Sequence, residues 1–132
     1  MIGSLDEVIP FEEQAIRLNP RAQDAAGWHY FIGGVHLLKG RTDEAIIWFE
    51  KSRSIYAGYH WTRASLAAAY ALKGETQHAA AELAEARKLS DRYSSITALT
   101  GAEQERLASP KNRALAETTY LAGLRLAGMP EE

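Results

Sequence analysis

Two similar segments of the chain, GRTDEA from Gly40 and GETQHA from Gly74, lie 34 residues apart. In this register small residues coincide with small ones and large residues with large ones: Gly33 with Ala67, His36 with Tyr70, Leu38–Lys39 with Leu72–Lys73, Ala45 with Ala79, Phe49 with Leu83 and Ser52 with Ala86. A fixed period of this length is typical of solenoids made of helical hairpins. The period therefore predicts an all-α fold in which antiparallel helical hairpins are stacked on one another.

Capping signals divide each period into two helices. Asp24 and Thr42 are expected N-caps, because their side-chain oxygens can accept hydrogen bonds from the first helical turn. Gly40 and Gly74 are expected to end helices in the left-handed conformation. The expected helices cover residues 24–39, 42–56, 59–73 and 75–90.

The spacing of residues within these helices predicts which side faces the core. Along residues 42–56, the inward stripe at helical spacing consists of Ala45, Phe49, Ser52 and Tyr56. Small residues are expected where neighbouring helices approach most closely, and these are Gly33, Ala45, Ala67, Ala79 and Ala86.

This pattern resembles the tetratricopeptide repeat, a pair of antiparallel helices of 34 residues. The matching motif residues are Gly33, Gly40, Ala45 and Phe49 in one unit and Leu66, Ala67, Tyr70, Gly74, Ala79 and Ala86 in the next. The closing proline of the motif is replaced by Ala57 and Asp91, and only Pro20 matches it. The resemblance implies a short right-handed solenoid with a C-terminal capping helix.

The resemblance also implies how the chain is divided. Residues 1–132 form one domain: 1–20 are the second helix of a truncated repeat, 24–57 and 58–91 are two repeats, and 92–132 hold an irregular helix and a capping helix. In the first segment Ser4 and Glu7 match a capping box, and Pro10 should kink the helix or delay its start. A solenoid end without its partner helix exposes an apolar face. We therefore expect the chain to be the tail of a longer protein, and self-association to be possible.

Signals near the C-terminus mark the last helices. Ser94 and Ser95 match a helix cap, and Ser109 with Pro110 combines a serine cap with proline at the first helical position. The last helix is expected to continue to about Ala127, where GMP ends it.

The ending TTYLAGLRLAGMPEE, together with AIRLNPRAQD and YHWTRASLAAAYALKGETQHAAAEL, resembles a bacterial group of signalling proteins. In that group such repeats follow a class III adenylate/guanylate cyclase domain, or sometimes the DNA-binding domain of a transcriptional regulator. The resemblance implies that this chain is the C-terminal repeat tail of a cyclase-like protein. The alternative is the sensor tail of a regulator. The cyclase's own metal-binding and nucleotide-binding residues would lie upstream of this chain.

Residues that could carry chemistry do not form a catalytic or metal-binding pattern. The chain has no cysteine, and neither GxSxG, SxxK, HExxH nor a phosphate-binding glycine loop is present. His29 and His36 are seven residues apart, but no carboxylate follows either at i+4, so both are expected to be packed or surface residues. His60 and His78 are expected at the surface near turns. We therefore expect no enzymatic activity, no cofactor and no metal.

Charges in the sequence also limit the classes of partner. The net charge of −2 and the pI of about 6.1 argue against a nucleic-acid surface. No apolar run is long enough to span a membrane, and a cytoplasmic location is expected. The acidic residues Asp43, Glu44, Glu82 and Glu85 are expected at helix starts or on solvated faces. The cluster Arg106, Lys111 and Arg113 is too small to predict a phosphate site.

A second set of residues on the first helix of each repeat differs in phase from the core stripe. In tetratricopeptide repeats this phase faces the concave groove that holds partners. The set comprises Tyr30, Gly34, Leu37 and Leu38 on one helix and Trp61, Ala64, Ala68 and Ala71 on the next. Relatives that bind charged chaperone tails carry lysine, arginine and asparagine there, so this groove should instead accept an apolar or aromatic helix from a protein or peptide. The alternative is that the chain's own last helix fills the groove.

Overall fold

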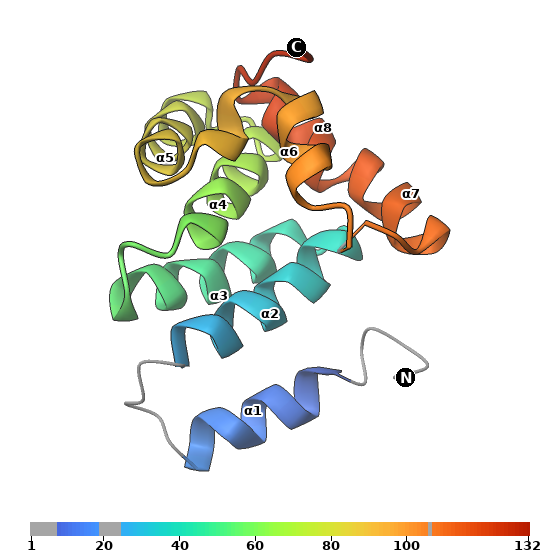
Figure 1. Ribbon diagram of the computed structural model, residues 1–132. Helices are drawn as coiled ribbons and strands as arrows, with labels where there is room; N and C mark the ends of the chain where they lie inside the picture. Colours follow the sequence, from blue (N-terminus) through green and yellow to red (C-terminus); the bar gives the residue numbers. More distant parts are fainter. Residues whose placement is uncertain (1–7, 19–24, 106) are drawn as a thin grey trace.

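The computed structural model describes residues 8–18, 25–105 and 107–132, and these residues form an all-α fold, as the sequence predicts (Figure 1). The elements are α1 (Val8–Leu18), α2 (Ala25–Leu38), α3 (Thr42–Ile55), α4 (His60–Leu72), α5 (Thr76–Leu89), the 3-10 turn η2 (Asp91–Ser94), α6 (Ile96–Ala102), α7 (Pro110–Thr118) and α8 (Tyr120–Leu126). Helix α2 packs on α1 and α3, α3 packs on α4, and α4 packs on both α5 and α8.

Helices α2 and α4 end with the same backbone geometry. Gly40 and Gly74 have φ angles of 78° and 85°, which residues with a Cβ rarely adopt. The amide that follows each glycine donates to the carbonyl five residues earlier. The Arg41 amide donates to the His36 carbonyl at 2.8 Å, and the Glu75 amide donates to the Tyr70 carbonyl at 2.9 Å. These hydrogen bonds satisfy carbonyls that the helix would otherwise leave unpaired. The predicted left-handed stops at both glycines are confirmed.

The core between α2 and α3 depends on one close approach. A Cβ on Gly33 would lie 2.6 Å from two ring atoms of Phe49, and Phe49 has no exposed surface. Ala45 and Ser52 are also fully buried, so three of the four residues predicted for the inward stripe face the core. Tyr56 does not, and its side chain is exposed. The reason is that α3 ends at Ile55, and the extended backbone of Tyr56 takes its ring off the helical stripe.

The predicted cap at Thr42 is wrong. Thr42 is the first residue of α3, the N-cap is Arg41, and no side chain caps this helix end. The turn at the end of α2 leads directly into the first hydrogen bond of α3, in which the Arg41 carbonyl accepts from the Ala45 amide at 3.0 Å. Pro10 lies in the first turn of α1, where its missing amide hydrogen removes no helical hydrogen bond. Ser4, Glu7, Pro20 and Asp24 lie outside the described residues.

The predicted single last helix is also wrong. Thr119, with φ −125° and ψ −83°, separates α7 from α8. Its hydroxyl donates to the Leu115 carbonyl at 2.7 Å. This side-chain hydrogen bond competes with the backbone hydrogen bonds of a continued helix. The break allows α8 to pack on α4, where Leu121 and Leu124 are fully buried. The predicted Ser109 cap with Pro110 in the first turn is confirmed.

The end of the chain folds back onto the start of α6. The Pro130 and Glu131 carbonyls accept from the Ile96 and Thr97 amides at 2.8 and 3.0 Å. The Ser95 hydroxyl accepts from the Ala98 amide at 3.0 Å, so the predicted serine cap is confirmed. These hydrogen bonds fix α6 and α8 relative to each other, and thereby place the residues that follow α6.

Candidate functional site

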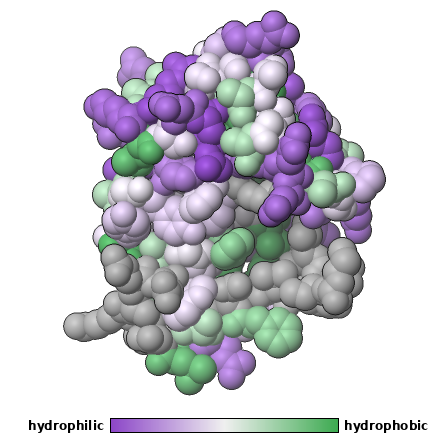
Figure 2. All heavy atoms as spheres, viewed as in Figure 1, coloured by the Kyte–Doolittle hydropathy of each residue, from purple (hydrophilic) through white to green (hydrophobic). Residues whose placement is uncertain are grey.

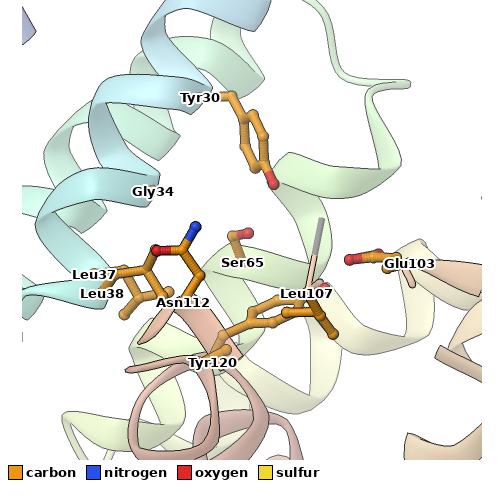
Figure 3. Close-up of a pocket in the computed structure, with 10 residues that line it drawn as sticks. Tyr30, Gly34, Leu37, Leu38, Ser65, Glu103, Leu107, Asn112 and Tyr120 are labelled. Carbon is orange, nitrogen blue, oxygen red and sulfur yellow. The ribbon is translucent and has the colours of Figure 1, made fainter. Parts of the chain in front are cut away.

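A cavity of about 190 Å³ lies between α2, α4, α7 and α8 (Figure 3). Ten residues line it: Tyr30, Gly34, Leu37, Leu38, Ser65, Glu103, Leu107, Asn112, Ala116 and Tyr120. The α2 half of the predicted groove set is therefore brought together in one cavity. We refer to this cavity as the α2 pocket.

Helix α2 forms one wall of the α2 pocket. No atom lies within 4 Å of the position that a Cβ on Gly34 would take, so this glycine leaves space. Its neighbour Gly33 is in the opposite situation, because it faces the ring of Phe49. Tyr30 and Leu37 contribute walls that are almost fully buried.

An exposed aromatic residue lies on the same face of α2. Phe31 is 52% exposed. It precedes Gly34 by three residues and Leu38 by seven, so the three positions share one side of the helix. Sequence reasoning did not single out Phe31, although its spacing from Gly34 could have revealed it. The pocket wall therefore continues into an apolar surface.

The opposite wall comes from the C-terminal part of the chain. Leu107 follows α6, Asn112 and Ala116 belong to α7, and Tyr120 begins α8. In Figure 3, Tyr30 and Tyr120 approach the cavity from opposite sides. None of these C-terminal residues was predicted, because the position of α7 depends on the break at Thr119.

Glu103 is the charged group of the α2 pocket. It is the C-cap of α6, and its side chain is only 2% exposed. Figure 3 shows its carboxylate directed toward the cavity. A terminal nitrogen of Arg92 lies 3.6 Å from its Oε2 atom. Sequence reasoning missed Glu103, because no local pattern distinguishes it from a surface glutamate.

The α4 half of the predicted groove set is covered. Ala64 and Ala68 have no exposed surface, and Ala71 is 5% exposed. Helix α8 lies against them so closely that a Cβ on Gly123 would be 2.4 Å from the Ala68 carbonyl oxygen. Trp61 is partly buried, with the guanidinium carbon of Arg92 at 5.5 Å from the centre of its ring. The predicted groove set is thus covered by α8 on α4, whereas on α2 Gly34 and Leu38 stay partly exposed beside the buried Tyr30 and Leu37.

The molecular surface also differs in hydropathy from one region to another. Figure 2 shows hydrophobic residues at the bottom of a hollow in the middle of the visible face, while hydrophilic residues predominate above it. Burial of an apolar group in such a hollow removes apolar surface from water on both sides.

The histidines occupy four different environments. His29 is buried, with its Nδ1 atom 2.6 Å from the Ala25 carbonyl oxygen, and His36 Nδ1 lies 3.2 Å from a Glu44 carboxylate oxygen. His78 is exposed, as predicted. His60 is not a surface residue: it is half-buried, with Nδ1 2.7 Å from the Tyr93 hydroxyl, because η2 folds over the start of α4. Within the described ranges, no group of three metal-ligating side chains is gathered.

Among the acidic residues, Glu82 departs from the prediction of a solvated face. It is 6% exposed and accepts hydrogen bonds from Arg53 and from Arg63, the latter at 3.0 Å from its Oε2 atom. This cluster joins α3, α4 and α5. Asp43 and Glu44 are exposed and Glu85 is partly exposed, in agreement with the prediction.

Tyr70 lies in the slot that corresponds to His36 and makes a different contact. Its hydroxyl donates to the Glu50 Oε2 atom at 2.7 Å. Burial and this hydrogen bond raise the pKa of Tyr70 to about 12. Of the predicted small basic cluster, Lys111 and Arg113 are exposed and Arg106 lies outside the described residues.

Comparison with known proteins adds no family. No protein-family model matches the chain, and no curated protein matches it. None of the helices in the described part of the chain has the length and apolar character needed to cross a bilayer.

Proposed function

We propose that this chain is a non-catalytic tetratricopeptide-repeat module, a short right-handed solenoid that binds a protein or peptide partner at the groove face of α2. The repeat interpretation is supported by the equivalent glycine turns after α2 and α4. It is also supported by buried residues that stand 34 positions apart. These pairs are Ala45 and Ala79, Phe49 and Leu83, and Ser52 and Ala86.

The observation that carries the binding proposal is the α2 pocket beside the exposed ring of Phe31. Grooves of helical proteins bind partner helices by burying apolar anchors, and a concave apolar site with a few polar groups is the usual form of a binding pocket. Since α8 already covers α4, the partner would be confined to the α2 side of the groove.

The resemblance to cyclase-associated repeats supplies the proposed context. The chain would be the C-terminal repeat tail of a cyclase-like signalling protein, with the sensor tail of a transcriptional regulator as the alternative. In either context the module would act in the cytoplasm and would contribute a protein contact, while catalysis or DNA binding would belong to another domain.

A second copy of the chain is the proposed occupant of a different surface. Phe11 and Leu18 of α1 are 69% and 78% exposed and lie seven residues apart on one helix face. Burial of this face in a self-association contact would remove both side chains from water. Sedimentation velocity should show association that increases with concentration and is weakened by Phe11→Ser. A strict monomer at high concentration would contradict this proposal.

A peptide selection tests the partner proposal. A displayed peptide library is selected on the wild-type protein, and the enriched peptides are then measured against Gly34→Leu, which fills the α2 pocket from its own wall. The Gly101→Leu variant is the matched control, because no atom lies within 4 Å of a Cβ there either and Gly101 is outside the pocket lining. Enriched peptides should bind wild type and the control but not Gly34→Leu. Equal binding to all three proteins would show that the pocket is not the site.

A further inference from the structure

We propose that two copies of this chain associate through their α1 helices, which lie antiparallel to each other about a two-fold axis. This inference rests on the proposed self-association and adds to it the geometry of the contact. Two observations lead to it: the outer face of α1 has one apolar edge and one charged edge, and the two charges on the charged edge have opposite signs.

The outer face of α1 is centred on Gln14, which is exposed. Phe11 and Leu18 are 69% and 78% exposed. At about 3.6 residues per turn, they point about 60° and 40° to one side of Gln14. Helix α1 packs on α2 at the lower end of the described helices in Figure 1, and Figure 2 shows hydrophobic residues at that end. We refer to Phe11 and Leu18 as the apolar edge.

Two charged residues lie on the other side of Gln14. Arg17 is exposed and Glu13 is partly exposed. By the same helical geometry, they point about 60° and 100° away from Gln14. Glu13 lies at the middle of α1 and Arg17 in its last turn. We refer to Glu13 and Arg17 as the charged edge.

An antiparallel arrangement matches these edges, whereas a parallel one does not. When a two-fold axis relates two antiparallel helices, each edge meets the same edge of the other copy. The apolar edges then bury each other, and Arg17 lies beside Glu13 of the other copy. In a parallel pair about a two-fold axis, the apolar edge would instead meet the charged edge. The charged groups would then lose water without gaining a partner.

The spacing along the helix permits both kinds of contact at the same time. With the two-fold axis at Gln14, Phe11 lies one residue step from the level of Leu18 in the other copy. Arg17 lies two steps from the level of Glu13 in the other copy. These offsets correspond to about 1.5 and 3 Å along the helix, which the long side chains can span. The contact therefore contains two apolar contacts and two ion pairs.

The expected association is weak and selective. A contact made by one helix from each copy buries little area, which is typical of weak and transient complexes. Exposed ion pairs add little affinity, but they select the orientation of the two copies. Association should therefore be seen at high protein concentration, and high salt should weaken it.

Charge reversal on the whole chain tests the arrangement. Glu13→Arg brings like positive charges together in the contact, and Arg17→Glu brings like negative charges together. In a mixture of the two variants, each altered edge meets the opposite charge. Within one chain Glu13 and Arg17 are four residues apart, so each reversal also removes a favourable pairing inside α1. Mixing cannot repair that loss, and it therefore isolates the contact between copies.

Sedimentation velocity measures the association, and native mass spectrometry separates homodimers from heterodimers by mass. Glu13→Arg and Arg17→Glu should each associate about fivefold or more weakly than wild type. Their equimolar mixture should associate at least as tightly as wild type and should consist mainly of heterodimers. The double variant Glu13→Arg/Arg17→Glu should also associate like wild type. A circular dichroism melt verifies that each variant is folded.

The matched control consists of Glu85→Arg and Lys88→Glu on α5. The Lys88 Nζ atom lies 3.2 Å from the Glu85 Oε1 atom, and neither residue belongs to α1. These substitutions change the net charge of the chain by the same amounts as the α1 reversals. Neither variant should alter the association, alone or in the mixture.

Three results would overturn the inference. If wild type associates and Phe11→Ser weakens it, but the α1 mixture shows no recovery, the self-association stands and the antiparallel arrangement is wrong. Equal enrichment of heterodimers in the control mixture would mean that net charge alone drives the pairing. A strict monomer at high concentration would contradict the proposed self-association as well. The peptide selection judges partner binding at the α2 pocket separately in each case.

Discussion

Helices α2 and α4 stand one 34-residue step apart, yet α8 covers the predicted groove residues of only α4. On α2, the position of Gly34 is open, with no atom within 4 Å of an added Cβ. On α4, the equivalent position is Ala68, which has no exposed surface because α8 lies on it. The two faces are therefore distinguished by the C-terminal helix α8 and by side-chain size, since Tyr30 and Leu37 of α2 stand where α4 has Ala64 and Ala71.

The comparison shows where a glycine is needed. At the open face the glycine is on the groove wall, and it enlarges the α2 pocket. At the covered face the glycine is on the incoming helix, because a Cβ on Gly123 would meet the Ala68 backbone at 2.4 to 2.8 Å. Helix α8 thus shows how closely a helix can approach this groove when it carries glycine at the point of contact. The same chemical change should have opposite consequences at Gly34 and Gly123.

The largest expected effect is that of Gly123→Leu. The neighbouring atoms belong to the Ala68 backbone, which cannot rotate out of the way, so α8 must move off α4. Overpacking of this kind should lower the free energy of unfolding by about 3 kcal/mol or more. Urea denaturation measures it, with Gly101→Leu as the control that should stay near wild type. A small effect would mean that α8 is not held at α4.

Gly33→Leu should have the next largest effect. The added side chain would collide with the buried ring of Phe49 and would force α2 away from α3. We expect a loss of about 1–3 kcal/mol in the free energy of unfolding. The neighbouring variant Gly34→Leu should unfold close to wild type in the same experiment. If Gly34 proves the less tolerant of the two positions, the assignment of the groove face is wrong.

Tyr70→Phe tests the hydrogen bond that distinguishes Tyr70 from His36, the residue 34 positions earlier. Loss of the hydrogen bond to Glu50 should lower the free energy of unfolding by about 1 kcal/mol at neutral pH. Because folding raises the pKa of Tyr70 from its ordinary value of 10.0 to about 12, this contribution is complete below pH 10 and declines as the pH rises toward 12. Denaturation of wild type and variant at pH 7 and pH 11 tests the trend, and a gap that widens at pH 11 would contradict it.

Gly34→Ala should have the smallest effect, with the opposite sign. The space for a methyl group is present, and alanine is favoured over glycine inside a helix. A gain of about 0.5–1 kcal/mol in the free energy of unfolding is expected. Gly123→Ala is the comparison, since the same added methyl group should destabilise there. A destabilised Gly34→Ala would show that the pocket wall is closely packed.

The features that depend on local spacing could be predicted from the sequence. The 34-residue register places Gly40 and Gly74 at helix ends, and it separates the packed Gly33 from the open Gly34. These features follow from turn geometry and helical periodicity, which a short window of sequence contains.

The features that depend on the C-terminal part could not be predicted in this way. Thr119 sits in a segment with no proline or glycine to indicate a break, and the break determines which helix faces α4. Glu82 and Glu103 have the local sequence of surface residues, yet both are buried and form ion pairs with arginines on other elements. Such placements are tertiary effects, and single-sequence periodicity carries no signal for them.

The difference between the two groove faces can be measured directly, because the chain contains no cysteine. Gly34→Cys and Ala68→Cys each place one thiol at an equivalent position, and mass spectrometry follows its reaction with methyl methanethiosulfonate in the native protein. Both variants should react at the same rate in urea. In native buffer, Gly34→Cys should react at least about tenfold faster, because the thiol at position 68 becomes accessible only when α8 opens. Equal native rates at the two positions would contradict the account of one open and one covered face.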